Sequence, residues 1–148
     1  MSLEAPVFLT GFMGVGKSKI GLILAQRMGR FFFDTDQMVE LRAGKSVAAI
    51  FADEGEEYFR QLEHRCVLAT SDRSDVVVAL GGGAITRQNN VEAVRRKGVL
   101  VCLEASVDTI FARVDRRNDR PLLGGLGPEE KRAKIVQMLD ERAPFYDQ

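Results

Sequence analysis

A stretch close to the N-terminus has the residues needed to bind phosphate. It fits the pattern G-x-x-x-x-G-K-[ST] at Gly11, Gly16, Lys17 and Ser18, between an apolar run and a helical pattern. Glycines let successive backbone N–H groups turn inward onto phosphate oxygens, and the helix starting near Lys17 adds its positive N-terminal end. Lys17 would reach the β- and γ-phosphates, and the Ser18 hydroxyl would ligate Mg²⁺. The stretch predicts a nucleotide phosphate site without naming the reaction.

Two aspartates follow the aromatic stretch RFFF, as the first and third residues of the sequence DTD. Asp34 and Asp36 are two residues apart, so an extended backbone would project both side chains the same way. The strand that would usually carry an acid beside magnesium ends in Gly81 without one, which leaves Asp34 to support the metal through water. Asp36 would then accept hydrogen bonds from a substrate hydroxyl. The structural alternative for Asp36 is a cap on the helix that follows.

Glycines and arginines supply the other candidates. The three glycines from Gly81 to Gly83 follow an apolar run and could bring bare N–H groups close to a ligand, although a simple turn would also explain them. Arg60 and Arg142 lie in helical patterns, where most arginines are solvated surface residues. Arg120 lies in the Gly/Pro-rich segment NDRPLLGGLGPEE. We expect this loop to close over phosphates, excluding water and adding charge.

The elements that must position these residues alternate between strands and helices. Short apolar runs predict strands at 6–10, 30–34, 75–80 and 98–103. Helical spacing predicts helices at 17–29, 45–53, 56–70, 86–97, 106–116 and 128–142. In the first helix, one face carries Ile20, Leu24, Ala25 and Met28. The alternation implies right-handed crossovers and therefore an α/β fold, a three-layer sandwich around a central parallel sheet.

Composition narrows the class of protein. A chain of 148 residues fits one domain. The 21 basic and 21 acidic residues cancel, so bulk nucleic-acid binding has no support. No secretory signal or membrane-spanning run is visible, and we expect a cytoplasmic protein. Cys66 and Cys102 lie outside any CxxC pattern and are interpreted as reduced, partly buried thiols. For the one histidine, His64, a surface or core position is favoured over a catalytic role.

Six segments, taken in order and spacing, resemble those of the shikimate kinase family: GFMGVGKS, FFDTDQMVE, EEYFRQLE, ALGGGA, DRPLL and ERAPFY. The resemblance extends from Val7 to Tyr146. It implies one P-loop kinase domain over 1–148, with a small helical insert that binds the substrate, at about 34–63, and a mobile lid at about 115–127. The implied reaction transfers the γ-phosphoryl group of ATP, with Mg²⁺, to the 3-hydroxyl of shikimate, on the way to chorismate and the aromatic amino acids.

The resemblance also implies roles on the nucleotide side. The residues expected to contact the nucleotide are Gly14, Val15, Gly16, Lys17, Ser18, Lys19, Arg113 and Arg120. Among these, Arg113 falls where some members stack an arginine on adenine, and Arg120 matches a lid arginine that reaches the transferred phosphoryl group. The expected metal-binding residues are Ser18 and, through water, Asp34.

On the acceptor side, Asp36 resembles the aspartate that binds the shikimate hydroxyls and is the candidate base. Arg60 and Arg142 match a pair that clamps the shikimate carboxylate, and Gly82 and Gly83 match the backbone that touches the substrate. The expected catalytic residues are Lys17, Asp36 and Arg120. The partners implied are ATP and shikimate, with no nucleic acid and no membrane, and we expect a monomer.

Two differences from the family pattern are visible. Members usually continue past ERAPFY through a strand and a helix that cover one sheet edge and supply part of the adenine pocket, whereas this sequence ends at Gln148. Lys19 stands where threonine is common and points to no lost function.

Two alternative functions stay open. A P-loop kinase of another small hydroxy acid, such as gluconate, is disfavoured by the combination of Asp36, Arg60, Arg142 and the three glycines. A non-catalytic nucleotide-binding module predicts loss of Asp34, Asp36 or Arg120, and all three are present.

Overall fold

Four parallel strands form the central sheet of the computed structural model, which describes residues 5–11, 16–104, 106–115 and 127–146. The strands lie in the order β2-β3-β1-β4. Their bounds are Val7–Thr10 for β1, Phe31–Asp34 for β2, Val76–Ala79 for β3 and Val99–Cys102 for β4. The predicted α/β fold with a parallel sheet is confirmed, and each strand is one or two residues shorter than the run that predicted it.

The register brings the carboxyl ends of three strands to one edge of the sheet. Leu9 of β1 lies beside Ala79 of β3, which in turn pairs with Asp34 at the end of β2. The N–H of Leu80 donates to the Leu9 carbonyl at 2.9 Å, so β1 and β3 stay paired to their ends. The loops after β1, β2 and β3 therefore leave the sheet together, at the edge where open parallel sheets bind ligands.

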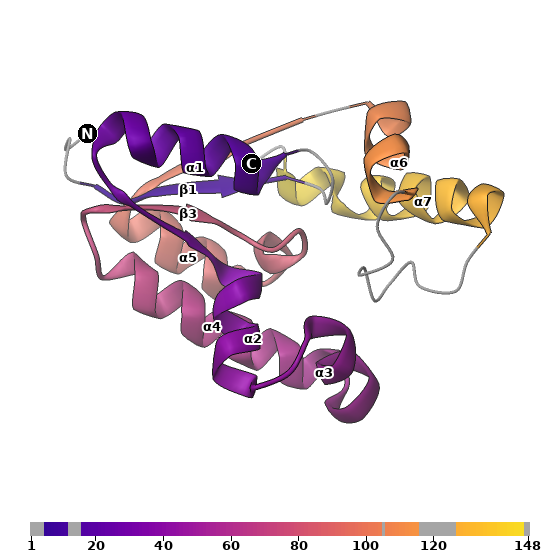
Figure 1. The fold of residues 1–148 in the computed structure, drawn as a ribbon, viewed down its shortest axis with the longest axis horizontal. Coiled ribbons are helices and arrows are strands. Elements are labelled where there is room, and N and C mark those ends of the chain that lie inside the picture. Colours follow the sequence, from indigo (N-terminus) through magenta and orange to yellow (C-terminus); the bar gives the residue numbers. More distant parts are fainter. Residues whose placement is uncertain (1–4, 12–15, 105, 116–126, 147–148) are drawn as a thin grey trace.

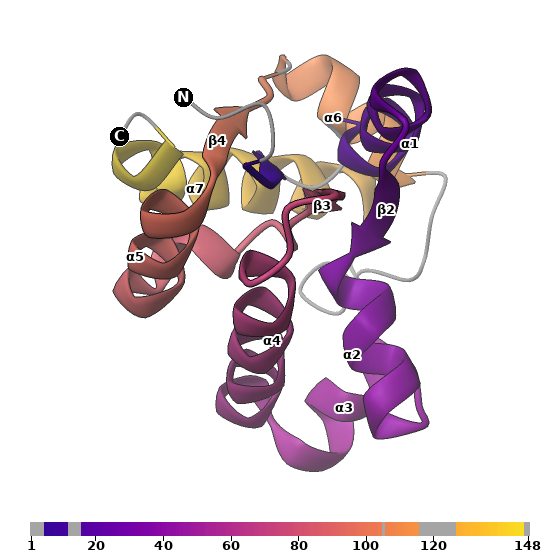
Figure 2. The same cartoon turned by 90° about the vertical axis from the view of Figure 1, so that its left-hand side faces the viewer.

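Helices cover both faces of the sheet (Figure 1). Helix α1 packs on β1, β2 and β3 from one side, whereas α4 and α5 lie together on the other. Helices α2 and α3 pack against α4 below the sheet, and α6 and α7 pack on each other (Figures 1 and 2). The bounds are α1 Lys17–Met28, α2 Thr35–Ala43, α3 Val47–Glu54, α4 Glu56–Ser71, the 3-10 helix η1 Ala84–Thr86, α5 Gln88–Lys97, α6 Val107–Asp115 and α7 Pro128–Tyr146.

The apolar run in β3 is explained by burial on both faces. Val76 and Val78 belong to the cluster under α4 and α5, while Val77 packs with Leu9 and with Ala25 of α1. Successive side chains of a strand point to opposite faces, so a strand covered on both sides needs consecutive apolar residues.

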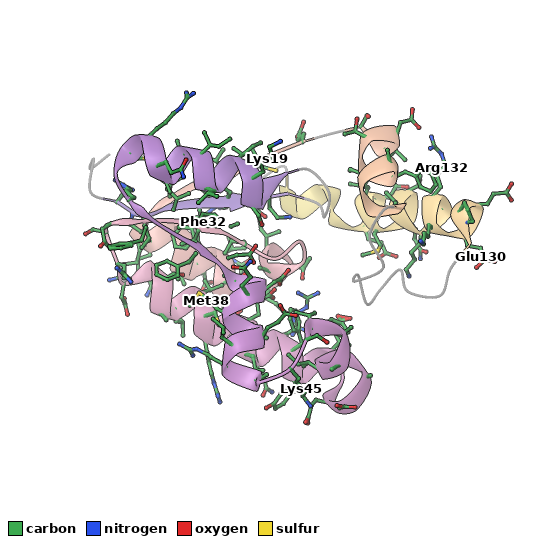
Figure 3. The ribbon with its side chains drawn as sticks, in the orientation of Figure 1. Lys19, Phe32, Met38, Lys45, Glu130 and Arg132 are labelled. Atoms are coloured by element: carbon green, nitrogen blue, oxygen red, sulfur yellow. The ribbon has the colours of Figure 1, made fainter. Side chains whose placement is uncertain are left out.

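The expected apolar face of α1 is partly wrong. Ile20 and Met28 are 44% and 42% exposed, and the residues buried against the sheet are Gly21 and Ala25. Small residues are needed there because α1 lies close to the sheet: a β-carbon on Gly21 would lie 2.5 Å from the Phe32 ring. Figure 3 shows Phe32 beneath α1.

Helices α2, α3 and α4 have a separate core. Val39, Ile50 and Phe59 pack with Leu62 and Cys66, and Met38 lies against this cluster. A helix following Asp36 was considered only as the alternative in which Asp36 caps it, and the residue pattern gave no bounds for α2. Its polar sequence, TDQMVELRA, buries only Thr35 and Val39 and so has no clear apolar face.

The connection from α2 to α3 is fixed by Lys45 (Figure 3). Its ammonium group donates to Asp53 at 3.2 Å and to Glu54 at 3.3 Å. Desolvation would lower the pKa of Lys45, but the hydrogen bonds to Asp53 and Glu54 outweigh it, and the pKa is raised above its ordinary value.

Helices α6 and α7 are joined by Arg132, which pairs with Asp108 and lies over the Phe111 ring (Figure 3). The two cysteines are free thiols, with Cys66 buried and Cys102 half-buried, as expected. Within the described part of the chain, no helix has both the length and the apolar character needed to cross a membrane.

Close approach of β4 to the N-terminal segment predicts an effect of Gly98→Ala. The added β-carbon would lie 2.3 Å from the Pro6 carbonyl oxygen and 2.9 Å from Pro6 Cγ. Because backbone must move, we expect a loss of about 1–3 kcal/mol in the free energy of unfolding by urea titration. Glu92→Ala, at an exposed position of α5, is the control. Equal stability of the two variants would contradict the packing described.

Candidate functional site

Two glycines of the stretch predicted to bind phosphate have conformations that other residues rarely adopt. Gly11 has φ 143° and Gly16 has φ 96°. Gly16 is also the N-cap of α1, where no side chain caps the helix, and the first turn holds no acidic residue. The N-terminal N–H groups and positive pole of α1 therefore face the end of β1 with no carboxylate from that turn to neutralise them.

Lys17 and Ser18, the first two residues of α1, turn toward the sheet edge. The Lys17 ammonium donates to the Gly11 carbonyl at 2.6 Å, which places it over the start of the loop. The Ser18 hydroxyl donates to Oδ2 of Asp34 at 2.6 Å. The structure thus joins the stretch at Gly11–Ser18 to the end of β2.

Asp34 uses both carboxylate oxygens. Oδ1 accepts from the backbone N–H groups of Asp36 at 2.9 Å and Gln37 at 3.4 Å, which makes Asp34 the N-cap of α2. The expectation that Asp34 and Asp36 project together from an extended backbone is therefore wrong, because the strand ends at Asp34 and Asp36 lies in the first turn of a helix. The cap considered for Asp36 is supplied by Asp34.

The pairing of Ser18 with Asp34 fits a magnesium site. A hydroxyl and a carboxylate are oxygen ligands of the kind that Mg²⁺ prefers, and Mg²⁺ usually takes few protein ligands beside waters and phosphates. Among the described residues, no group of three or more His, Cys, Asp or Glu side chains could hold a metal ion. A cation at Ser18 and Asp34 would need further oxygens, which nucleotide phosphates can supply.

The backbone after β3 is closely approached by side chains from two helices. A β-carbon on Gly81 would lie 2.7 Å from Oδ1 of Asp36 and 2.8 Å from Oε2 of Glu63. The N–H of Gly81 donates to Oγ1 of Thr35 at 2.9 Å, which ties the start of α2 to this backbone. Two carboxyl groups therefore meet at Gly81, one from α2 and one from α4.

Arg60 lies against Gly83, two residues after Gly81. It is 7% exposed, and a β-carbon on Gly83 would lie 2.4 Å from one of its guanidinium nitrogens. The guanidinium donates to Oε1 of Glu63 at 3.0 Å, and Glu63 is fully buried. Glu56 lies 3.9 Å from Nε and is half-exposed. The structure holds a buried arginine against bare backbone, where a planar donor can bind a carboxylate.

Two residues of this arrangement were missed in the sequence. Glu63 occupies the apolar stripe of α4, between Leu62 and Cys66, and a lone acid in such a stripe is a signal for a buried partner. Thr35 gave no signal, because a buried threonine that binds backbone looks like any polar residue at a helix start. Burial raises the pKa of the Cys66 thiol, in keeping with a core position.

Some expected residues are not placed. Gly14, Val15 and Arg120 lie outside the described residues. Arg113 and Arg142 belong to α6 and α7, but their side chains lie outside the described part of the structure. Lys19 is exposed on α1 (Figure 3). Gly82 lies between the two closely approached glycines in the sequence.

Comparison with known proteins decides the family. The model of the family described as shikimate kinase matches residues 13–148. A shikimate kinase from Caldanaerobacter subterraneus is 42% identical over 95% of this chain and 80% of its own length. A second, from Salinibacter ruber, is 44% identical over 95% of this chain and 72% of its own length. The chain belongs to the shikimate kinase family. The resemblance found in the six segments is thereby confirmed.

Solved shikimate kinase structures share the fold. One from Acinetobacter baumannii, in complex with shikimate, has a TM-score of 0.92 and 36% identity, covering 97% of this chain and 78% of that one. A gluconokinase from Sinorhizobium meliloti has a TM-score of 0.58 and 17% identity, which shows a common fold alone. The family gives the activity class as well: an ATP-dependent phosphotransferase.

Because Arg60 and Glu63 form a buried ion pair, we predict that Glu63→Ala is strongly destabilising. The substitution removes the nearest carboxylate of Arg60 and leaves the guanidinium charge buried. We expect a loss of about 3 kcal/mol in the free energy of unfolding, at the low end of the usual range because Glu56 remains nearby. Glu92→Ala, at an exposed position of α5, should change stability by less than about 0.5 kcal/mol. Urea unfolding of both variants measures the difference, and a similar small effect for both would rule out a stabilising Arg60–Glu63 pair.

Proposed function

We propose that this chain transfers the γ-phosphoryl group of ATP to the 3-hydroxyl of shikimate. One observation carries the proposal beyond family membership: a hydroxyl-accepting carboxylate, Asp36, and a buried guanidinium, Arg60, meet at Gly81–Gly83 on the sheet edge that also holds Ser18 and Asp34. A small carboxylate that bears hydroxyls is the kind of acceptor that such a pair recognises.

The nucleotide half of the proposed site consists of the loop after β1 and the first turn of α1. Backbone N–H groups, the helix pole and the Lys17 ammonium would hold the phosphates of ATP. Ser18, with Asp34 through water, would hold Mg²⁺. When bound, the ion would neutralise charge on the phosphates.

In the acceptor half, Asp36 would hold a substrate hydroxyl and take its proton during transfer. Arg60 would bind the carboxylate, with the backbone of Gly82 and Gly83 against the ring. Arg60 is already paired with Glu63 and lies 3.9 Å from Glu56, so a bound carboxylate needs a second cation. Arg142 is our candidate, supported by the contact of α7 with η1.

The remaining nucleotide contacts are proposed from the sequence. Gly14, Val15 and Gly16 would supply loop N–H groups, with Lys19 beside them on α1. Arg120, in the segment at 115–127 proposed as a lid, would reach the transferred group and stabilise the charge of the transition state. Arg113 would stack on adenine.

We further propose that the chain works in the cytoplasm as a monomer that needs neither nucleic acid nor membrane. The supporting observations are its use of ATP, its free cysteines and its balanced charge.

Asp36→Asn tests the acceptor half. It removes the proton acceptor but keeps the shape, so we expect turnover to fall by about 10²- to 10⁴-fold with ATP affinity unchanged. The measurement is shikimate-dependent ADP release in a coupled assay, with ATP affinity taken by calorimetry. Gluconate in place of shikimate is the comparison substrate. Normal turnover by the variant would contradict the role of Asp36, and gluconate-dependent release by the wild type would contradict the substrate.

Gly83→Ala tests the carboxylate position. Its β-carbon would push against the Arg60 guanidinium, which cannot retreat from its buried pair with Glu63. We expect the KM for shikimate to rise about tenfold, equivalent to about 1.4 kcal/mol, with the KM for ATP unchanged. Steady-state kinetics with each substrate varied separately measure this. A rise confined to the KM for ATP would contradict the proposal that Arg60 binds shikimate.

A further inference from the structure

A hydrogen-bonded chain connects α4 to the glycine-rich backbone after β3. Nδ1 of His64, one residue beyond Glu63, lies 2.6 Å from Oδ1 of Asn90 on α5. The amide nitrogen of Asn90 donates to the carbonyl of Ala84 at 2.9 Å. Ala84 directly follows Gly83, and Asn90 is 1% exposed. The chain therefore ends one residue from the backbone on which Arg60 lies.

The direction of both hydrogen bonds follows from their chemistry. A backbone carbonyl only accepts, so the NH₂ group of the Asn90 amide faces Ala84 and its oxygen faces His64. The ring of His64 must then carry its proton on Nδ1 and donate it. Every polar atom of the Asn90 side chain has a partner, which makes the orientation of this buried amide definite.

Both backbone groups of Ala84, directly after the three glycines, are hydrogen-bonded. Its N–H donates to the Gly81 carbonyl at 3.0 Å, and its carbonyl accepts from the N–H of Arg87 at 3.2 Å. The turn is thus held to itself, and it continues into α5 through the Arg87 carbonyl, which accepts from the N–H groups of Asn90 and Val91. The Asn90 side chain adds a hydrogen-bonded tie from Ala84 to α5 and, through His64, to α4. A second link, between Arg87 and Glu57 at 2.8 Å, is partly exposed, and exposed ion pairs contribute little.

We propose that Asn90, oriented by His64, is a positioning residue for the carboxylate subsite. Its hydrogen bonds to Ala84 and His64 fix the position of the backbone at Gly82 and Gly83 relative to the Arg60 guanidinium. It acts through this backbone and not by contact with the substrate. This inference rests on the proposed function for the identity of the ligand, whereas the tie between α4, α5 and the turn is independent of it.

The test compares Asn90→Leu, which keeps the volume but removes both hydrogen bonds, with the wild type. We expect the KM for shikimate to rise about tenfold. The KM for ATP and kcat should change little, because the loop proposed to bind phosphate follows β1 and the altered turn follows β3. His64→Phe should act in the same direction, and His64→Gln, which can still donate, should restore part of the loss. Gln61→Ala, at an exposed position of α4, is the matched control and should leave both KM values unchanged.

Hydrogen exchange gives a readout that does not depend on activity. In Asn90→Leu and His64→Phe, the amides of residues 82–87 should exchange faster, while those of β1 and β3 keep their protection. A fall in thermal stability with both KM values raised equally, or with loop exchange unchanged, would overturn the proposal and leave Asn90 a packing residue. If Asn90→Leu does not fold, the two His64 variants decide by the same criteria. Failure of the proposed function is seen separately, as a wild type without shikimate-dependent turnover.

Discussion

The lack of a β-carbon at Gly81 and Gly83 is the constraint on which the candidate site depends. Carboxyl oxygens of Asp36 and Glu63 and the guanidinium of Arg60 occupy the space that side chains at these positions would fill. Three groups on two helices can meet at the end of one strand because the backbone there is bare. The burial of Glu63 and Arg60 follows from this approach, and so does the need for each to have the other as a partner.

A second constraint comes from the division of the apolar interior. The sheet has clusters on its two faces, whereas α2, α3 and α4 pack around their own cluster of Val39, Ile50, Phe59, Leu62 and Cys66. Asp36 and Arg60 belong to α2 and α4, which form that third cluster, whereas Ser18 belongs to α1, which packs on the sheet. Asp34 spans the two, because one oxygen caps α2 and the other accepts from Ser18. Thr35 adds a second tie by binding the N–H of Gly81.

Much of the fold could be predicted from the sequence because its signals are local. Apolar runs such as VVVAL at 76–80 are buried on both faces, and glycine or proline marks the ends of most elements. The bounds of helix α2 could not be predicted, because the helix depends on the cap at Asp34 and on two buried residues rather than on an apolar stripe. The buried face of α1 was predicted incorrectly, because the sequence pattern pointed to its larger apolar residues. The helix lies so close to the sheet that only small residues, Gly21 and Ala25, fit between them. This closeness depends on tertiary packing and leaves no pattern in the local sequence.

The site was predicted less completely than the fold. The contact of Lys17 with Gly11 follows from the phosphate pattern, since that pattern encodes one loop and one helix start. The contact of Ser18 with Asp34 lies outside the pattern, because it joins this helix to the end of β2. Asn90 went unnoticed because its hydrogen bonds to His64 and to the Ala84 carbonyl form only when α4, α5 and the turn after β3 pack together. The partner of Glu63 is close in the sequence, since Arg60 lies three residues earlier on the same helix. What the sequence does not give is the approach of Glu63 to Gly81, which depends on how α4 packs at the end of β3.

The uncapped start of α1 has a consequence for the energetics of the whole chain. Helices α2 and α3 have their first N–H groups satisfied by the side chains of Asp34 and Ser46, but Gly16 has no side chain with which to do the same for α1. An anion bound there takes the place of the missing cap, which in other helices is worth about 0.5–2 kcal/mol. Since such a ligand binds only the folded chain, the melting temperature of this protein should rise with the concentration of a bound polyanion. A nucleotide would therefore contribute to the stability of the fold.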